Sequence, residues 1–277
     1  MNIGKYVQLY SDDLKLRRYA TNTIENYRCQ VELFLKHFDG IATKPSEISE
    51  RQIKDWLLLA KTKNTISHRL SALKLFYELT GKQPMKLRYI KYPRSEKKLP
   101  IPLSQEEVQR MFDVCTNLKH KVILSLLYGC GLRVSELINL KWSNIDRSRM
   151  IINIIGAKGG KDRQVMLPES IIELLTKYWH AYRPKEYVLN GQFELKYSDR
   201  SVNEIMKSLA LNAGINKRVY THLMRHNCFT HMVENGVDIN LIQRLAGHSS
   251  VKTTAIYTHI SHNIVSKIQS PLANISI

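Results

Sequence analysis

The sequence has few cysteines, few acidic residues and no long apolar run, and each shortage excludes a class of protein. The four cysteines (Cys29, Cys115, Cys130 and Cys228) lack the paired spacing of a disulfide framework or a zinc ribbon. No stretch approaches the ~18 consecutive apolar residues that a membrane span requires. The amphipathic start, which contains acids, does not fit a secretory signal. We therefore expect reduced thiols, a cytoplasmic location and no membrane partner.

The shortage of acids leaves a strongly basic chain. Its 24 aspartates and glutamates face 42 lysines and arginines, which gives a formal net charge of +18 over 277 residues. A polyanion, most simply nucleic acid, is the natural partner of such a chain, although a merely soluble basic protein is the alternative. The excess is uneven, because residues 1–40 hold six basic and five acidic residues whereas residues 41–98 hold fourteen and five.

The stretch 83–103 is expected to be a linker between two domains. It contains Pro84, Pro93, Pro100 and Pro102, and proline interrupts helices and favours an extended path. Its basic residues exceed what a spacer needs, so we expect some of them to follow DNA phosphates. The residues assigned to this role are Lys91, Arg94, Lys97 and Lys98.

The patterns on either side of this linker predict a mainly α-helical protein. Residues 1–82 show helical periodicity and predict a bundle of about four helices. Residues 104–277 begin with a predicted capping box, in which Glu107 follows Ser104 by three positions. The run "MIINIIGAKGGKDRQVMLP", from residue 150 to 168, instead predicts a β-hairpin. A second, mixed but mostly helical domain with a small hairpin or sheet is expected there.

The segment "THLMRHNCF" concentrates histidine and arginine in a run that is otherwise apolar. If Thr221 is the N-cap, His222 lies in the first helical turn and Arg225 shares its face, where a helix N-terminus already favours an anion. The i, i+4 spacing of His222 and His226 also fits a metal pair, but Leu223 stands where a zinc hydrolase has glutamate. Core histidines satisfied by backbone are a third interpretation, and they leave Arg225 unexplained.

Three further motifs complete a pattern. "GCGLRVSEL" contains Arg133, "KGGKDR" begins with Lys158 in the hairpin turn, and "GHSSVKTTAIYTH" contains His248 and Tyr257. In this order, together with His222 and Arg225, they resemble the tyrosine recombinase (phage integrase) family, in particular its Xer-like and integron-integrase-like branch. The resemblance covers essentially the whole chain. Met224, Cys228, Phe229 and Ala157 depart from the usual family residues, and none of them is at a catalytic position.

The resemblance implies a SAM-like core-binding domain over residues 1–82 and a catalytic domain over 104–277. Tyr257 would attack a DNA phosphodiester to form a 3′-phosphotyrosine, with no metal, ATP or other cofactor. The remaining expected roles fall to Arg133 and Arg225 on the phosphate oxygens, His222 as base or orienting group, His248 as donor, Lys158 as general acid and Glu136 in support. Lys161 is the alternative lysine and is otherwise expected on DNA.

The resemblance also implies the partners. They are double-stranded DNA with a specific recombination site, and three further copies in a tetramer on two sites, with or without an accessory protein or second recombinase. The apolar tail, residues 263–277, would dock on a neighbouring subunit, or on its own catalytic domain. Two rival functions are a type IB topoisomerase-like enzyme that relaxes DNA and a non-enzymatic DNA-binding protein.

Overall fold

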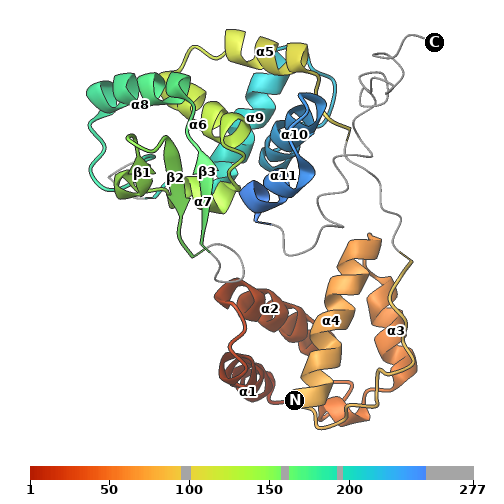
Figure 1. Ribbon diagram of the computed structural model, residues 1–277. Coiled ribbons are helices and arrows are strands. Elements are labelled where there is room, and N and C mark those ends of the chain that lie inside the picture. The colour runs from red at the N-terminus through yellow and green to blue at the C-terminus, as the bar shows by residue number, and fades with distance from the viewer. Residues whose placement is uncertain (95–100, 157–161, 192–195, 248–277) are drawn as a thin grey trace, which may run out of the picture. The chain divides into compact units, whose positions relative to one another are not determined.

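The computed structural model describes residues 1–94, 101–156, 162–191 and 196–247, and it divides into two compact units, Met1–Lys97 and Lys98–Ile277. Helices dominate both units, and the predicted mainly α-helical class is confirmed (Figure 1). Among the described residues, no helix combines the length and the apolar character needed to cross a bilayer.

The first unit is a helical bundle around an aromatic core. Tyr10 meets Phe76 edge to face at 5.5 Å between ring centroids, and Phe34 meets Trp56 in the same way at 5.1 Å. The Tyr10 hydroxyl donates to a backbone carbonyl at 2.9 Å, so its burial leaves no polar atom without a partner. The helices are α1 (Ile3–Leu16), α2 (Thr21–His37), α3 (Glu50–Leu58) and α4 (Lys63–Leu79).

The predicted linker begins inside this unit. Leu87 and Ile90 are buried in the same aromatic core, and the Tyr92 ring lies under the ammonium group of Lys74 on α4, 4.8 Å from the ring centroid. Proline spacing and charge indicated a solvated, extended path here, but Leu87 and Ile90 bury their side chains against the bundle. The exposed Lys91 and Arg94 lie at the end of this packed segment.

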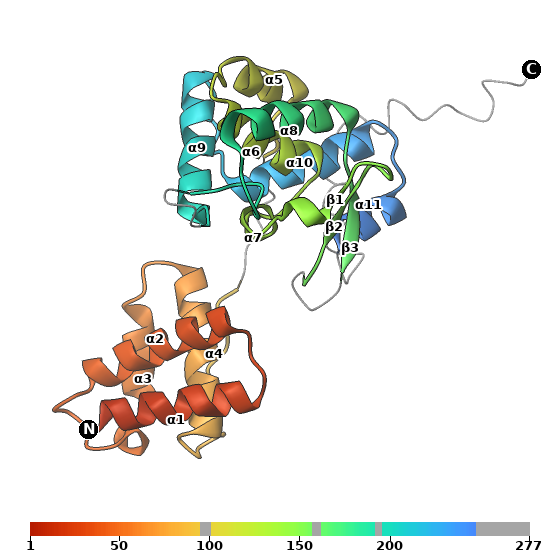
Figure 2. The ribbon, with the colours of Figure 1, turned by 90° about the vertical axis from the view of Figure 1, so that its left-hand side faces the viewer.

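The second unit is built around helix α6, which packs between α8 and α10 (Figure 2). Its core runs continuously through α6, where Val122 to Leu127 are all buried. The predicted capping box is present, because Ser104 Oγ accepts from Glu107 N at 3.2 Å and Glu107 Oε2 accepts from Ser104 N at 2.8 Å. The helices are α5 (Gln105–Asp113), α6 (Leu118–Gly129), α7 (Val134–Ile138), α8 (Glu169–Tyr182), α9 (Asp199–Asn212), α10 (Thr221–Glu234) and α11 (Ile239–Ala246).

The predicted hairpin is part of a small antiparallel sheet. β2 (Ile151–Ile154) pairs with β3 (Arg163–Met166), so that Ile154 faces Arg163 next to the hairpin turn. A two-residue strand, β1 (Ile145–Asp146), adds to the other edge of β2. This short strand was not predicted, because two residues carry no alternation that a sequence pattern can detect. β3 also packs against α11, which brings the sheet edge to the C-terminal end of that helix.

Near the start of the second unit, Leu103 is held in place by its backbone hydrogen bonds and is 1% exposed. The Leu103 backbone N–H donates to Asn227 Oδ1 at 3.1 Å, and its carbonyl oxygen lies 2.9 Å from His231 Nε2. The other ring nitrogen of His231 lies 2.8 Å from the Tyr128 hydroxyl on α6. The partner of the Leu103 N–H and the partner of its carbonyl oxygen are therefore both side chains of α10, and they lie on the helix face opposite His222.

Candidate active site

Arg225 is the most deeply buried charge among the described residues of the second unit. Only 1% of it is exposed, and its guanidinium lies over the Phe229 ring at 4.8 Å from the centroid. Two backbone carbonyls, those of Gly131 and Ala246, accept from its terminal nitrogens. A buried cation without such acceptors would be costly, so these carbonyls explain how the fold tolerates it.

The glycines of "GCGLRVSEL" make this contact possible. Gly131 has a φ of +62°, and a Cβ there would lie 2.8 Å from Phe229 Cζ. Since side chains rarely adopt this backbone conformation and the space is already filled, glycine is the residue that fits. It places its own carbonyl against Arg225 and starts the turn into α7.

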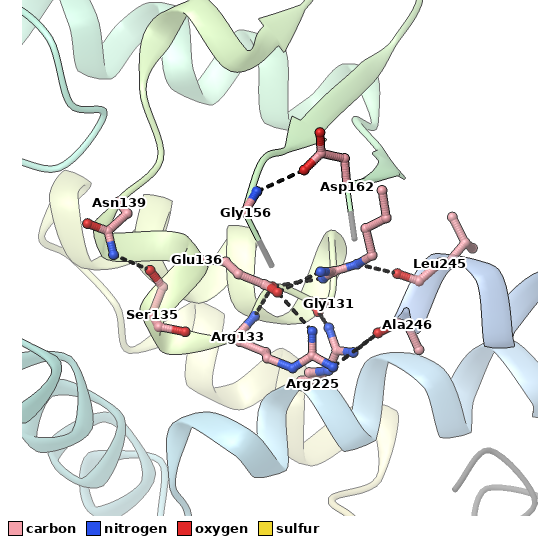
Figure 3. A network of polar contacts seen from close by, with 11 residues as sticks. Gly131, Arg133, Ser135, Glu136, Asn139, Gly156, Asp162, Arg225, Leu245 and Ala246 are labelled. Atoms are coloured by element: carbon pink, nitrogen blue, oxygen red, sulfur yellow. Dashed lines mark hydrogen bonds and ion pairs between the residues drawn. The ribbon is translucent and has the colours of Figure 1, made fainter. Parts of the chain in front are cut away.

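Arg133 is the N-cap residue of α7, and its side chain points toward the Ala246 carbonyl that Arg225 also contacts. Its Nη1 donates to Glu136 Oε1 at 2.8 Å, and its Nη2 donates to the Ala246 carbonyl at 3.3 Å. Ala246 thus accepts from both Arg133 and Arg225, so the two guanidiniums converge at the C-terminal end of α11 (Figure 3). The negative end of a helix dipole is a favourable position for cations.

A third arginine, which the sequence interpretation missed, completes the cluster. Arg163 Nη2 donates to Glu136 Oε2 at 2.8 Å, and its Nε donates to the Leu245 carbonyl at 2.8 Å. The side chains of Arg163 and Glu136 are 6% and 7% exposed. "KGGKDR" drew attention to its lysines, and only the pairing of β3 against α11 shows where its final arginine lies.

Glu136 is the carboxylate that links these arginines. Burial by itself would raise the pKa of Glu136, but hydrogen bonds from Arg163 and from the Arg133 backbone and side chain outweigh it and hold the pKa at about 2. The group is therefore ionised at neutral pH, and its two oxygens fix two guanidiniums at once. Its expected supporting place next to Arg133 agrees with the structure.

His222 lies in the first turn of α10, as predicted, but Thr221 does not cap the helix. Tyr220 is the N-cap residue, and Thr221 is instead held by Asn203 of α9, whose Oδ1 accepts from its N–H at 3.2 Å and from its hydroxyl at 3.1 Å. That tertiary contact removes the threonine hydroxyl from the capping role. The helix start is fixed from α9 rather than by a local cap.

The His222 ring has an exposed surface and packs edge-on against His226, with 4.5 Å between centroids. Desolvation, followed by the positive charges of Arg225 and Arg133, lowers the pKa of His222 below its ordinary value of 6.5. The imidazole is accordingly neutral at pH 7. Within the described ranges, no three His, Cys, Asp or Glu side chains gather as metal ligands.

The other predicted site residues cannot be placed in this arrangement. Lys97, Lys98, Lys158, Lys161, His248 and Tyr257 lie outside the described residues, as does the tail 263–277. The described part of the chain ends one residue before His248. α11 ends in Gly247, a left-handed C-cap with φ +60°, and His248 is the next residue.

Family models and known proteins match most of the chain. Residues 102–263 match the phage integrase family, and residues 7–87 match the phage integrase N-terminal SAM-like domain. Tyrosine recombinase XerA of Thermococcus onnurineus is 34% identical over 275 residues, which cover 96% of this chain and 95% of the relative. A tyrosine recombinase of Thermosipho africanus is also 34% identical, over 94% of this chain and 96% of the relative.

Solved structures show the same fold. A crystal structure of XerA recombinase matches with 28% identity and a TM-score of 0.56, covering 96% of this chain and 99% of that one. The site-specific recombinase XerH bound to palindromic difH substrate matches with 20% identity and a TM-score of 0.72, over 94% and 83% of the two chains. The chain belongs to the phage integrase family, and the prediction that it is a site-specific tyrosine recombinase of the Xer-like branch is confirmed.

Proposed function

We propose that Tyr257 attacks a DNA phosphodiester held by Arg133 and Arg225, forms a 3′-phosphotyrosine and releases a 5′-hydroxyl. A 5′-hydroxyl from a partner strand then attacks the phosphotyrosine and reverses the step. One ester bond replaces another in each step, so the reaction needs neither ATP nor a metal. The observation that supports this most directly is the convergence of two guanidiniums on one carbonyl, two residues before His248.

The charge of the cluster suits such a reaction. Arg133, Arg163 and Arg225 with Glu136 sum to a formal charge of +2, close to the dianionic charge of a five-coordinate phosphoryl transition state. A guanidinium carries five N–H donors, so the two described contacts of Arg133 do not exhaust its capacity to bind phosphate oxygens. Because the cluster is fixed before DNA arrives, little reorganisation is needed during the reaction.

Proton transfer is assigned to the remaining polar residues. The phenol of Tyr257 has an ordinary pKa of about 10, so it needs a base or an orienting group at neutral pH. Neutral His222, with its lowered pKa, can accept that proton. Lys158, or Lys161 in its place, would protonate the leaving 5′-oxygen, and His248 would donate to a non-bridging oxygen.

The partner is double-stranded DNA that carries a specific recombination site. XerH, which shares the fold, is described with its difH substrate, and the net charge of +18 suits a polyanion. Lys91, Arg94, Lys97 and Lys98 would contact DNA phosphates. We further propose a tetramer on two sites, joined by the tail 263–277, with or without an accessory protein, and a cytoplasmic location.

The test is covalent trapping on a nicked recombination site, from which the short 5′-hydroxyl strand is lost after cleavage. Wild-type protein is expected to form an adduct that resists denaturant, in the presence of a chelator. Tyr257→Phe is expected to bind the same DNA and form no adduct, whereas Tyr182→Phe, at an exposed tyrosine of the same unit, is expected to cleave normally.

Three outcomes would redirect the proposal. An adduct that persists in Tyr257→Phe would move the nucleophile elsewhere. Adduct formation and DNA relaxation without exchange between two sites would favour a topoisomerase-like activity, and binding without any adduct would leave a DNA-binding protein.

A further inference from the structure

Arg163 joins two parts of the site that are far apart in sequence. On one side its guanidinium pairs with both oxygens of Glu136, the carboxylate that also holds Arg133. On the other side its Nε donates to the Leu245 carbonyl at 2.8 Å, at the C-terminal end of α11. Arg163 is thus the strand residue through which β3 meets both α7 and α11.

Arg163 is tightly packed as well as hydrogen-bonded. A Cβ at Gly247 would lie 2.8 Å from Arg163 Cδ, so the aliphatic part of the side chain lies against the backbone of the α11 cap. Successive carbonyls of α11 therefore meet different arginines. Leu245 accepts from Arg163, and Ala246 accepts from Arg133 and Arg225.

The geometry of these contacts favours arginine over any other residue. A planar guanidinium can bind a carboxylate with two parallel N–H groups and still use Nε for a third acceptor. A lysine ammonium at this position would keep the charge but could not hold both the carboxylate and the helix end in fixed orientations. With its side chain 6% exposed, Arg163 is also poorly placed to reach a DNA phosphate itself.

We propose that Arg163 is a positioning residue for DNA cleavage: it orients Arg133 through Glu136 and fixes the end of α11, from which the chain continues to His248. This inference rests on the proposed function, since it assigns a part in the same cleavage step. It differs from a purely structural ion pair, because Arg133, which Glu136 holds in turn, would itself touch the scissile phosphate.

The experiment compares Arg163→Met and Arg163→Lys with wild type in single-turnover cleavage of the nicked site at saturating protein. Assays are run below the melting temperature of each variant. Arg163→Met is expected to slow cleavage ~10²-fold, the effect of a misplacement of about 1 Å in a reacting group, while the affinity for an uncleaved site changes little. Arg149→Met is the control, because Arg149 is an exposed arginine of the same unit. Its side-chain ion pair with Asp146 is long, at 3.9 Å between Nε and Oδ2.

The pH dependence of cleavage separates positioning from mere stability. The charged groups that face Glu136 in the described part of the chain are Arg133 from α7 and Arg163 from β3, with Arg225 of α10 sharing the Ala246 carbonyl. Without Arg163 the pKa of Glu136 rises, and a protonated Glu136 holds Arg133 less firmly. On acidification Arg163→Met should therefore begin to lose activity at a higher pH than wild type, and Arg163→Lys, which keeps the charge, should be slow with a wild-type pH profile.

The results have separate meanings. If wild type cleaves and Arg163→Met cleaves at the same rate, or melts lower but keeps the wild-type rate and pH profile, the positioning role is wrong and the proposed function stands. If Arg163→Met does not fold, Arg163→Lys decides, and a wild-type rate in that variant overturns the inference. Absence of any wild-type adduct would instead overturn the proposed function.

Discussion

The two units of this recombinase are stabilised by opposite means. In the first unit the centre consists of rings, with Tyr10 against Phe76 and Phe34 against Tyr77 in edge-to-face contact. The two tyrosine hydroxyls donate to backbone carbonyls. In the second unit an apolar core surrounds a cluster of charge, in which Arg225 and Glu136 are almost completely buried. Both are compact helical structures, yet among the described residues only the second unit places fully buried ionised side chains inside.

The difference shows what each unit is built to do. Ring packing is non-directional apart from its edge-to-face preference, and it tolerates small shifts at modest cost. A buried ion cluster contributes little net stability, because desolvation offsets most of the attraction, but it fixes positions closely. The second unit therefore gives up part of its stability in exchange for preorganised charge.

The largest expected effect is that of removing the buried cation. Arg225→Ala should lower the rate of cleavage ~10³-fold or more, because a main phosphate ligand is lost. It should also lower the free energy of unfolding of the second unit by about 1–3 kcal/mol, since the buried Gly131 carbonyl loses the Arg225 donor and the Ala246 carbonyl keeps only the one from Arg133. Single-turnover cleavage and thermal melting measure the two effects.

The matched variant in the first unit is Arg69→Ala. Arg69 lies over the Trp56 ring at 4.4 Å, a cation–π contact worth about 0.5–1 kcal/mol at a partly exposed site. Its loss should leave the rate of cleavage of fully bound DNA within about twofold of wild type. Equal loss of cleavage in both variants would mean that the charges of the second unit have no special part in the reaction.

Gly247→Ala tests whether cleavage depends on the close packing of Arg163 against the end of α11. The new methyl group would meet Arg163 Cδ at 2.8 Å, so we expect cleavage to slow ~10-fold to ~10²-fold through a displaced Arg163. Gly214→Ala in the same unit and Gly40→Ala in the first unit are controls. Each has positive φ (+67° and +81°) but nothing within 4 Å of the added atom.

Backbone strain is common to all three glycine variants, at roughly 1 kcal/mol each. The controls should therefore melt at lower temperature and cleave at the wild-type rate. If Gly214→Ala slows cleavage as much as Gly247→Ala does, strain rather than contact with Arg163 is the cause.

Acid should unfold the second unit before the first. The pKa of Glu136 is lowered to about 2 in the folded protein, so its contribution to stability is present above its ordinary value near 4.5 and is lost as pH falls toward 2. We expect this loss to reach roughly 2 kcal/mol. In the first unit the carboxyls whose pKa is lowered, those of Asp12, Glu32 and Glu47, pair with exposed lysines, and such surface pairs contribute little stability.

Tryptophan fluorescence can follow the units separately. Trp56 reports on the first unit, and Trp142 and Trp179 report on the second, so Trp56→Phe and the double variant Trp142→Phe/Trp179→Phe isolate the two signals. Glu136→Gln should flatten the acid dependence of the second unit alone. Earlier acid unfolding of the first unit would contradict the expectation.

The smallest effect on the reaction is expected from the basic residues of the predicted linker. Neutralising Lys91, Arg94, Lys97 and Lys98 together should reduce the slope of log affinity against log salt by up to roughly 3–4, because each phosphate contact releases counterions. Preference for one site over another should change little, since phosphate contacts carry no base information. A salt slope equal to that of wild type, measured by fluorescence anisotropy, would leave this segment as a spacer.

Sequence patterns predicted most of the elements because those elements follow local rules. The Ser104 capping box and the hairpin were found as predicted. Periodicity, caps and turn residues act within a few positions of one another. Where a distant contact decided the outcome, as at Thr221 with its partner Asn203, the local interpretation was wrong.

The site was predictable in part for the same reason. Motifs singled out Arg133, Glu136, His222 and Arg225, and the structure brings these four together. Arg163 was missed because its partners lie 27 and 82 positions away. No spacing rule covers such distances, and the burial of Leu87 within the expected linker is a further case in which tertiary packing decides.

The attachment of Leu103 to α10 restricts how the chain can vary in length. Both backbone groups of this residue are engaged by side chains of one helix, so a residue inserted or deleted between Leu103 and α5 would shift the pairing onto a neighbour of different size. The same change made before residue 101 leaves that pairing intact. Insertions and deletions in related chains should therefore accumulate ahead of this residue, and engineered fusions or longer tethers between the units should be introduced there.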